Sequence, residues 1–379
     1  MRIAILGAAG AMAAVTLRDL LDSVPGVAIT AADRRPVEVS DPRVTPVALD
    51  AANEEATARL LAGHDAVLNA ATYYLNVPVM RAALKARVPY ADLGGLYHGT
   101  LRQVELHEEL RAAGVPAVLG MGSTPGITNV MAAALARGLD SVEEIHVRVG
   151  CLDRAASGPL PIPYALDTVL DEFSLEPMVF RAGRPAAVPP LSGGETIAFP
   201  PPVGEMSALY TLHSEIAMFP RSFPGLREAS FKVAFEPELT RQVELLVRLG
   251  FAAREPLVRE VSPREMLLAL AARQTRPPGE PDDCDVLRVD LAGTVAGRRI
   301  CRRAEVTALP DRARRFPAGA LDTGVPLSIV GQMLARREIS TPGVLYPETA
   351  VPIEPFFAQL ARRGMSLSRE ALAAWEHTA

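Results

Sequence analysis

The sequence is poor in cysteine, with three among its 379 residues. Cys151, Cys284 and Cys301 are too far apart for a Cys-x-x-Cys metal motif or for the disulfide framework of a small secreted domain. We therefore expect no metal site and a reducing compartment, the cytoplasm.

Long apolar runs and an excess of one charge are also missing. No stretch reaches the length of a transmembrane helix, and apolar residues 3–6 are too few for a signal peptide. The chain has 39 Lys and Arg against 44 Asp and Glu, so it carries no basic field. The sequence therefore predicts neither a membrane nor a nucleic acid as partner.

What is present is the composition of a globular protein, with 49% hydrophobic and 22% charged residues. A chain of 379 residues is long for a single hydrophobic core. We expect two domains.

The N-terminus carries the most specific pattern. Residues 2–6 predict a buried strand that runs into a glycine turn, a helical pattern and a second strand over 27–30. In such a unit Gly7 permits the tight turn and Gly10 lets the backbone approach a pyrophosphate, which the helix N-terminus would hold. The pattern predicts a dinucleotide site, and the alternative is an ordinary strand–helix–strand turn.

Asp33 ends the second strand, where a carboxylate accepts hydrogen bonds from an adenosine ribose. It favours NAD, although Arg34 or Arg35 would pair with the 2′-phosphate of NADP if Asp33 turned away. The predicted cofactor-binding residues are Gly7, Ala9, Gly10, Ala11, Met12, Asp33, Arg34, Asp50, Ala51, Ala70, Ala71 and Thr72.

Strand and helix patterns alternate up to about residue 122, which predicts an α/β fold with a Rossmann-type, doubly wound parallel sheet. Later β-type segments at 228–235, 285–292 and 298–309 predict a second, α+β domain with a mostly antiparallel sheet. We expect a first domain over 1–123, a second over 124–340 for substrate binding and dimerisation, and a C-terminal segment, 341–379, that returns to the first domain.

Three local patterns predict helices in the second half of the chain. Residues 262–265, Ser-Pro-Arg-Glu, form a capping box that starts a helix through about residue 272. Residues 327–336 and 352–363 predict amphipathic helices.

Several motifs follow one another in an order that resembles a known family. They are the glycine turn, 90–95 (YADLGG), 124–129 (TPGITN), 323–328 (TGVPLS) and 343–348 (GVLYPE). Together they resemble the saccharopine dehydrogenase-like family, nearest its lysine 6-dehydrogenase branch. The resemblance implies NAD(P)-linked oxidation of an amino acid at a C–N bond, or the reverse reduction, by a homodimer. Residues 211–224 do not match the lysine enzymes, so the substrate stays open.

Candidate catalytic residues must handle a proton beside the reacting C–N bond. His213 and Glu215 are two apart, so on a strand they would face the same way; the alternative is a surface strand with ordinary polar residues. Asp92 ends a parallel strand, where ligands gather, unless it serves as a turn or cap. Tyr74 follows the fourth strand, where its hydroxyl would reach the substrate or its ring would pack against the cofactor.

Three residues are candidates for substrate binding. Arg221 would bind a substrate carboxylate through a bidentate contact; the alternative, in a chain so rich in arginine, is an ordinary surface arginine. Thr124 and Asn129 lie at the predicted domain junction; Asn129 would otherwise form a bond within its helix start. We thus expect a small, amino-acid-like substrate. The alternatives are a non-catalytic NAD(P)-binding regulator and a saccharopine-type reductase that joins an amine and a keto acid.

Overall fold

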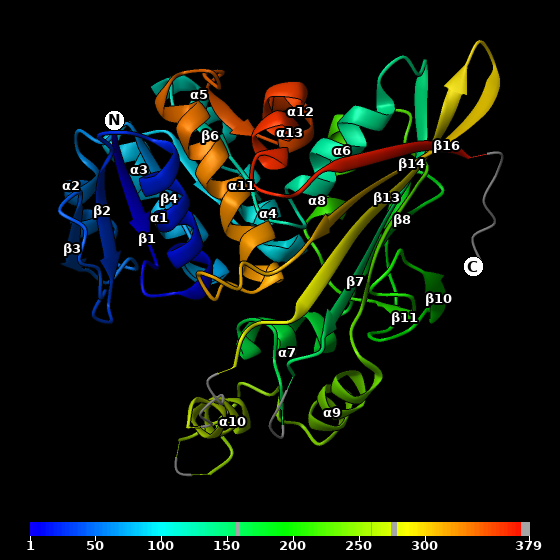
Figure 1. Ribbon diagram of the computed structural model, residues 1–379, viewed down its shortest axis with the longest axis horizontal. Helices are drawn as coiled ribbons and strands as arrows, with labels where there is room; N and C mark the ends of the chain where they lie inside the picture. Colours follow the sequence, from blue (N-terminus) through cyan, green and yellow to red (C-terminus); the bar gives the residue numbers. More distant parts are fainter. Residues whose placement is uncertain (157–159, 259, 274–278, 373–379) are drawn as a thin grey trace.

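A computed structural model describes residues 1–156, 160–258, 260–273 and 279–372. It contains two β-sheets side by side, each with its own helices (Figure 1). Among the described residues, no helix is long and apolar enough to cross a membrane.

The first sheet has seven parallel strands in the order β15-β6-β5-β4-β1-β2-β3. The strands are β1 (Arg2–Leu6), β2 (Ala28–Asp33), β3 (Val44–Ala48), β4 (Ala66–Asn69), β5 (Tyr90–Asp92), β6 (Pro116–Val118) and β15 (Gly343–Leu345). Its order reverses direction between β1 and β4, as in a doubly wound sheet, so the predicted fold class is confirmed.

Both faces of this sheet are buried because alternate residues of β1 enter different cores. Ile3 and Ile5 join one hydrophobic cluster with residues of the helices at 11–23 and 318–335, whereas Ala4 and Leu6 join a second cluster with residues of the helices at 54–61, 76–86 and 107–113. The helices of this half are α1 (Ala11–Ser23), α2 (Glu54–Leu61), α3 (Asn76–Ala86), α4 (Leu96–Val104) and α5 (His107–Ala113), with a short 3₁₀ turn at Tyr73–Leu75.

The second sheet has nine strands, and its main path runs β10-β11-β12-β7-β13-β14-β16. Its strands are β7 (Ser141–Asp153), β8 (Met178–Arg181), β9 (Arg184–Ala187), β10 (Glu195–Ala198), β11 (Glu205–Tyr210), β12 (Glu228–Ala234), β13 (Asp283–Val295), β14 (Arg298–Ala308) and β16 (Leu367–Leu372). Only β12 and β7 pair in parallel, so the sheet is mostly antiparallel, as predicted.

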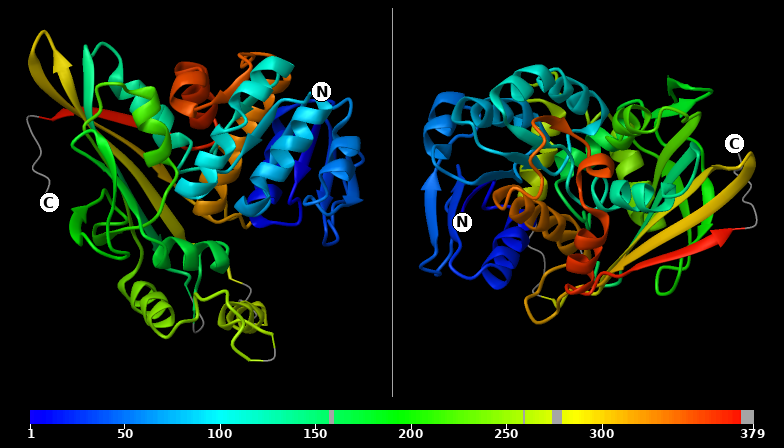
Figure 2. Two further views of the ribbon diagram at one scale, coloured as in Figure 1. Left: turned by 180° about the vertical axis from the view of Figure 1, so that it is seen from behind. Right: turned by 90° about the horizontal axis from the view of Figure 1, so that it is seen from above.

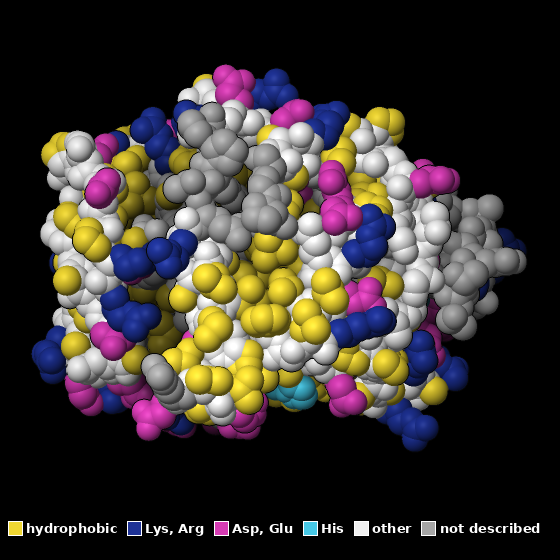
Figure 3. Space-filling model, turned by 90° about the horizontal axis from the view of Figure 1, so that it is seen from below, with side chains coloured by type: hydrophobic (Ala, Val, Ile, Leu, Met, Phe, Trp, Pro, Cys, Tyr) yellow, Lys and Arg dark blue, Asp and Glu magenta, His cyan; other side chains and the backbone are white. Residues whose placement is uncertain are grey.

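The helices of the second half are α6 (Ile127–Ala136), α7 (Leu166–Ser174), α8 (Glu215–Ser222), α9 (Pro237–Arg248), α10 (Pro263–Ala272), α11 (Ala318–Ala335), α12 (Pro347–Ala350) and α13 (Ile353–Ala361). The capping box of α10 is formed: Glu265 N donates to Ser262 Oγ at 3.1 Å, and Ser262 N donates to Glu265 Oε2 at 2.8 Å. Figure 3 views the face on which α9 and α10 lie, and hydrophobic side chains gather across it.

Helix α11 lies beside α1, far from it in sequence (Figure 2). Thr16 Oγ1 donates to Gly324 O at 2.9 Å, and a Cβ at Gly324 would stand 2.6 Å from Met12 O. The helix begins at Ala318 rather than at the predicted residue 327, and it is buried without interruption over 324–334. The prediction of an amphipathic helix there was wrong because α11 is enclosed on all sides.

After the second sheet, the chain thus returns to the parallel sheet: α11 packs against α1 and β4, and β15 pairs with β6. It then ends in the second sheet, where β16 pairs with β14. The boundaries at residues 123 and 340 stay predictions. What the topology provides is a crevice at the carboxyl ends of β1, β4 and β5, faced by the second sheet.

Candidate active site

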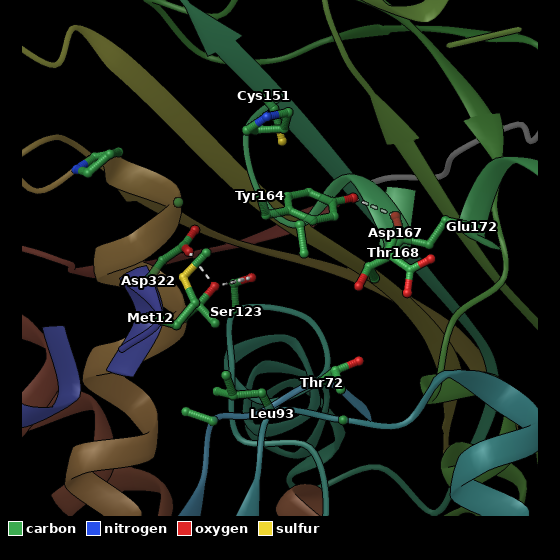
Figure 4. A pocket seen from close by; sticks show the side chains of 18 of the residues that line it. Met12, Thr72, Leu93, Ser123, Cys151, Tyr164, Asp167, Thr168, Glu172 and Asp322 are labelled. Carbon is green, nitrogen blue, oxygen red and sulfur yellow. Dashed lines mark hydrogen bonds between the residues drawn. The ribbon is translucent and has the colours of Figure 1, made fainter. Parts of the chain in front are cut away.

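A pocket of about 890 Å³ lies between the two halves of the chain. Met12, Thr72 and Leu93 line it from the parallel-sheet side, and Cys151 and Tyr164 line it from the other (Figure 4). It opens at the carboxyl ends of the parallel strands, which is where ligands bind in open α/β sheets.

The glycine turn fits a pyrophosphate. Gly7 has φ of 75°, and a Cβ there would stand 2.5 Å from Ala71 N, so only glycine permits this close packing of the two strand ends. Gly10 caps α1 and has no side chain to satisfy the N–H groups of the first turn. Those N–H groups and the positive end of the helix dipole are suited to hold phosphates.

Asp33 is fixed beside this turn. One carboxylate oxygen accepts from Ala9 N at 3.1 Å and the other accepts from Arg35 N at 2.8 Å. The carboxylate therefore faces the glycine turn instead of turning away, and it lines the pocket together with Arg34.

His213 and Glu215 form a buried pair. His213 Nδ1 lies 2.6 Å from Glu215 Oε2, the imidazole stacks on Phe231 with ring centroids 3.8 Å apart, and Thr124 Oγ1 donates to the other oxygen of Glu215. Burial works against the charged ring, but the carboxylates of Glu215 and Glu172 outweigh it and raise the pKa of His213. The pKa of Glu215 is lowered, because the imidazolium and the Thr124 hydroxyl overcome the effect of burial.

Glu172, on α7, lines the same pocket as His213, and Figure 4 shows it beside Tyr164. Tyr164 donates its phenolic hydrogen to Glu172 Oε2. Burial raises the pKa of Glu172 to about 7, even though the charge of His213 and the Tyr164 hydrogen bond act in the opposite direction. Such a carboxyl group changes protonation near neutral pH and is suited to proton transfer.

Further carboxyl groups continue along the wall. Burial, followed by the charge of Asp283, raises the pKa of Asp285 to about 7. Cys151 lines the pocket near Asp285, and burial, followed by the charge of Asp285, raises the pKa of this thiol well above its usual range. Cys151 is therefore a neutral thiol and no nucleophile.

Most of the predicted cofactor residues line this pocket. Those that do are Gly7, Gly10, Met12, Asp33, Arg34, Ala51, Ala70, Ala71 and Thr72, whereas Ala9, Ala11 and Asp50 are absent from its lining. Asp50 instead accepts from Ala52 N at 3.0 Å. Their roles stay predictions.

Of the predicted catalytic residues, His213 and Tyr74 line the pocket, whereas Asp92 and Glu215 do not. Asp92 is fully buried and accepts from Gln103, Tyr90 and the backbone N–H groups of Gly94 and Gly120. With its oxygens occupied, it holds the ends of β5 and β6 together. The Tyr74 hydroxyl contacts Asp171 and Arg254, away from His213.

The placement of His213 and Glu215 on a strand was wrong. Strand β11 ends at Tyr210, and Glu215 is the first residue of α8. The two side chains meet because the loop turns into the helix between them.

The three predicted substrate-binding residues are dispersed. Thr124 lines the pocket, whereas Arg221 and Asn129 do not. Arg221 Nη1 donates to Ala217 O at 2.6 Å within its own helix. Asn129 accepts from Gly126 N at 3.0 Å and donates to Glu348 at 2.8 Å, so it forms the bond at its helix start that was the alternative.

Sequence reasoning missed Glu172, Tyr164, Asp285 and Asp322, all of which line the pocket. No motif marks them, because they come from separate elements that only the tertiary fold brings together. Within the described ranges, no group of three or more His, Cys, Asp or Glu side chains is arranged to hold a metal ion.

Comparisons with known proteins agree with this fold and pocket. The sequence model of the saccharopine dehydrogenase NADP binding domain matches residues 3–118, and that of the saccharopine dehydrogenase C-terminal domain matches residues 122–365. The carboxyaminopropylagmatine dehydrogenase of Synechocystis sp. is 23% identical over 387 aligned residues, covering 96% of each protein.

Among solved structures, the apo saccharopine dehydrogenase (L-Glu forming) of Saccharomyces cerevisiae shares the fold. Its TM-score is 0.73 at 16% identity, over 98% of this chain and 100% of the yeast chain. The predicted family and the predicted NAD(P) cofactor are thereby confirmed. The chain belongs to the saccharopine dehydrogenase family and is an NAD(P)-dependent dehydrogenase.

Proposed function

We propose that this protein interconverts a secondary amine and its imine, at a C–N bond of a small substrate derived from an amino acid. The observation that carries the proposal is that Glu172 and His213, whose charges shift each other's pKa, both line the pocket that also contains the glycine turn. The Synechocystis relative, a dehydrogenase named for a carboxyaminopropyl derivative of agmatine, supports a substrate with an amine-linked carbon.

The dinucleotide would lie with its pyrophosphate at the start of α1 and its adenosine ribose at Asp33. Because Asp33 faces the glycine turn, a 2′-phosphate would meet a carboxylate there, which supports NAD over NADP. Bound NAD(P) accepts the hydride from the substrate carbon in oxidation and supplies it in reduction.

The proton is assigned to Glu172. As a carboxylate it would accept the proton from the substrate nitrogen during oxidation, and as a carboxylic acid it would return that proton during reduction. A pKa of about 7 makes both forms available near neutral pH. His213 acts as a positioning residue, since its charge favours the carboxylate form of Glu172 and Glu215 maintains that charge.

We also infer a homodimer in the cytoplasm, as the family resemblance implies. The three cysteines are free thiols, which supports a reducing compartment. A mass measured by light scattering tests the dimer: twice the chain mass of 40.4 kDa supports it and the monomer mass contradicts it.

The proposed reaction is tested by following NADH formation with a panel of secondary amines that link two amino acids. We expect turnover of at least one panel member by the wild-type protein. Glu172→Gln should lower kcat by about 10²- to 10⁴-fold, the usual contribution of a general acid–base. Glu348→Gln is the matched control, since Glu348 is another buried carboxyl group with a raised pKa but lies outside the pocket. Full activity of Glu172→Gln would contradict the assignment.

A further inference from the structure

Three carboxyl groups meet where the end of the second sheet touches α11. Asp283 and Asp285 are two apart at the start of β13, so their side chains share a face of the strand, and Asp322 projects from α11 (Figure 4). A Cβ at Gly319 would stand 2.9 Å from Asp285 Oδ2, so β13 and the first turn of α11 are in close contact. We call these three residues the acidic recess; all three line the pocket.

The acidic recess has oxygens without partners. Asp322 is 1% exposed, and its Oδ1 accepts from Thr323 Oγ1 at 3.2 Å. Asp322 Oδ2 and Asp283 Oδ1 are buried and accept no hydrogen bond from any residue that the structure describes. A buried polar atom in this state costs free energy unless a ligand satisfies it.

No basic side chain among the described residues pairs with the recess. Within the described part of the chain, neither Asp285 nor Asp322 forms an ion pair with Arg, Lys or His. Other buried carboxyl groups of this protein have partners for both oxygens: Asp171 lies 2.6 Å from Arg264, Asp290 lies 2.6 Å from Arg303, and both oxygens of Asp92 accept hydrogen bonds. The recess differs from them because two of its buried oxygens have no such partner among the described residues.

Two neighbouring buried carboxyl groups can be satisfied by a retained proton or by a cation. Burial and the charge of Asp285 raise the pKa of Asp322 well above its usual range, so Asp322 is protonated when no ligand is bound. A cation entering the recess would replace that proton. An anionic group such as a pyrophosphate would be repelled, so the recess does not suit that part of the cofactor.

We propose that the acidic recess binds a cationic nitrogen group of the substrate, an ammonium or a guanidinium, remote from the C–N bond that reacts. This rests on the proposed function, which places the reacting nitrogen at Glu172. Figure 4 shows the separation: Asp322 projects from α11 on one side of the pocket, and Glu172, which accepts from the Tyr164 hydroxyl, projects from α7 on the other. The substrate class is thus an amino-acid-derived amine with a second, positively charged end.

The proposal is tested with two probes of nearly equal shape and different charge, butylguanidinium and butylurea. Each is titrated by calorimetry into the wild-type protein saturated with NADH. We expect the cation to bind about tenfold or more tightly than the neutral probe. We also expect it to release protons, detected as a dependence of the heat on buffer ionisation. Equal affinities, binding of the urea alone, or no binding of either probe would overturn the proposal.

Variants of the recess residues test whether the cation binds at the recess. Asp322→Asn and Asp285→Asn should each remove most of the preference for butylguanidinium without changing the NADH affinity. Glu348→Gln, a buried carboxyl group outside the pocket, should retain that preference. An unchanged preference in both aspartate variants, or an equal loss of NADH affinity, would contradict the assignment. If a variant fails to fold, the wild-type comparison of the two probes still decides.

Failure of this inference is distinguishable from failure of the proposed function. If the protein oxidises secondary amines that lack a second cationic group as efficiently as those that have one, the recess has no such role and the proposed reaction still holds. If butylguanidinium binds as expected but no amine reduces NAD, the recess stands and the reaction fails.

Discussion

His213 Nδ1 lies 2.6 Å from Glu215 Oε2, and both side chains are buried, with His213 lining the pocket and Glu215 behind it. The pKa of His213 is raised and that of Glu215 is lowered, so the pair is charged between the two values. This charged state matters for Glu172, because the imidazolium counteracts the burial that raises the carboxyl pKa.

Glu215→Gln should lower the pKa of His213, because it removes the carboxylate that favours the imidazolium. The expected shift is toward lower pH in an NMR titration of the imidazole ring. The stability contributed by His213 is present below its unfolded pKa and is lost as the pH rises through the folded value. That contributed by Glu215 is present above its unfolded pKa and is lost as the pH falls through its folded value.

The same variant should unfold more easily between these limits, where the pair is charged. Removing one member of a buried ion pair costs about 3 kcal/mol, measurable in urea unfolding at pH 6, which lies between the lowered pKa of Glu215 and the raised pKa of His213. An unchanged imidazole titration together with unchanged stability would show that the two groups are not coupled.

Glu172 should make the protein less stable as the pH rises. Its pKa is about 7 in the folded protein against 4.5 for the ordinary group, so the folded state favours the protonated carboxyl. Its contribution is present below the unfolded pKa and is lost as the pH rises through 7, a change of up to about 3 kcal/mol. Unfolding free energies at pH 5 and pH 8 should differ less in Glu172→Gln than in the wild type. An identical difference in both proteins would show that Glu172 titrates normally.

Gly7→Ala should disturb both stability and cofactor binding. The new Cβ would stand 2.5 Å from Ala71 N, and φ at this position is 75°. We expect a loss of about 2–3 kcal/mol in urea unfolding and a clear loss of NADH affinity. Gly26→Ala is the control, since it has φ of 71° and nothing within 4 Å of the new Cβ. It should lose only about 1 kcal/mol. Equal losses in the two variants would refute the close packing of Gly7 on Ala71.

Asp33→Asn should reverse the preference between the two dinucleotides. Without the carboxylate, the ribose of NADH loses an acceptor and a 2′-phosphate no longer meets a negative charge. We expect weaker NADH and stronger NADPH binding, measured by nicotinamide fluorescence. Arg35→Ala, at the exposed neighbour, should weaken only NADPH. If Asp33→Asn leaves the ratio of the two affinities unchanged, the carboxylate does not select the cofactor.

The parallel sheet was predictable because its signals are local. Arg2–Leu6 is a mostly apolar strand followed by a glycine turn, and Ala28–Asp33 is one that ends in an acid. Each strand and each helix of the alternation can be identified from a short stretch of the sequence. The pairing of β16 with β14 joins residues more than 60 positions apart, and the burial of α11 against α1 joins residues about 300 apart, so no local pattern contains either.

The candidate site was predictable only in part for the same reason. His213 and Glu215 were found because they are near neighbours in sequence, even though the loop that joins them is no strand. Asp92 ends a parallel strand as predicted, but its oxygens are all used within the fold, a fact that depends on Gln103 and Gly120. Glu172 acquires its raised pKa from burial, which a sequence does not display.

The most direct measurement of the central claim is deuterium transfer from NADH labelled at its reactive C4 position. The wild-type protein is incubated with the labelled NADH and a pool of 2-oxo acids and primary amines, which form imines in solution, and the products are analysed by mass spectrometry. The account predicts a secondary amine with one deuterium on the carbon bonded to nitrogen, and about a hundredfold less of it with Glu172→Gln. Deuterium in a 2-hydroxy acid instead, or in no product at all, would contradict a reaction at the C–N bond.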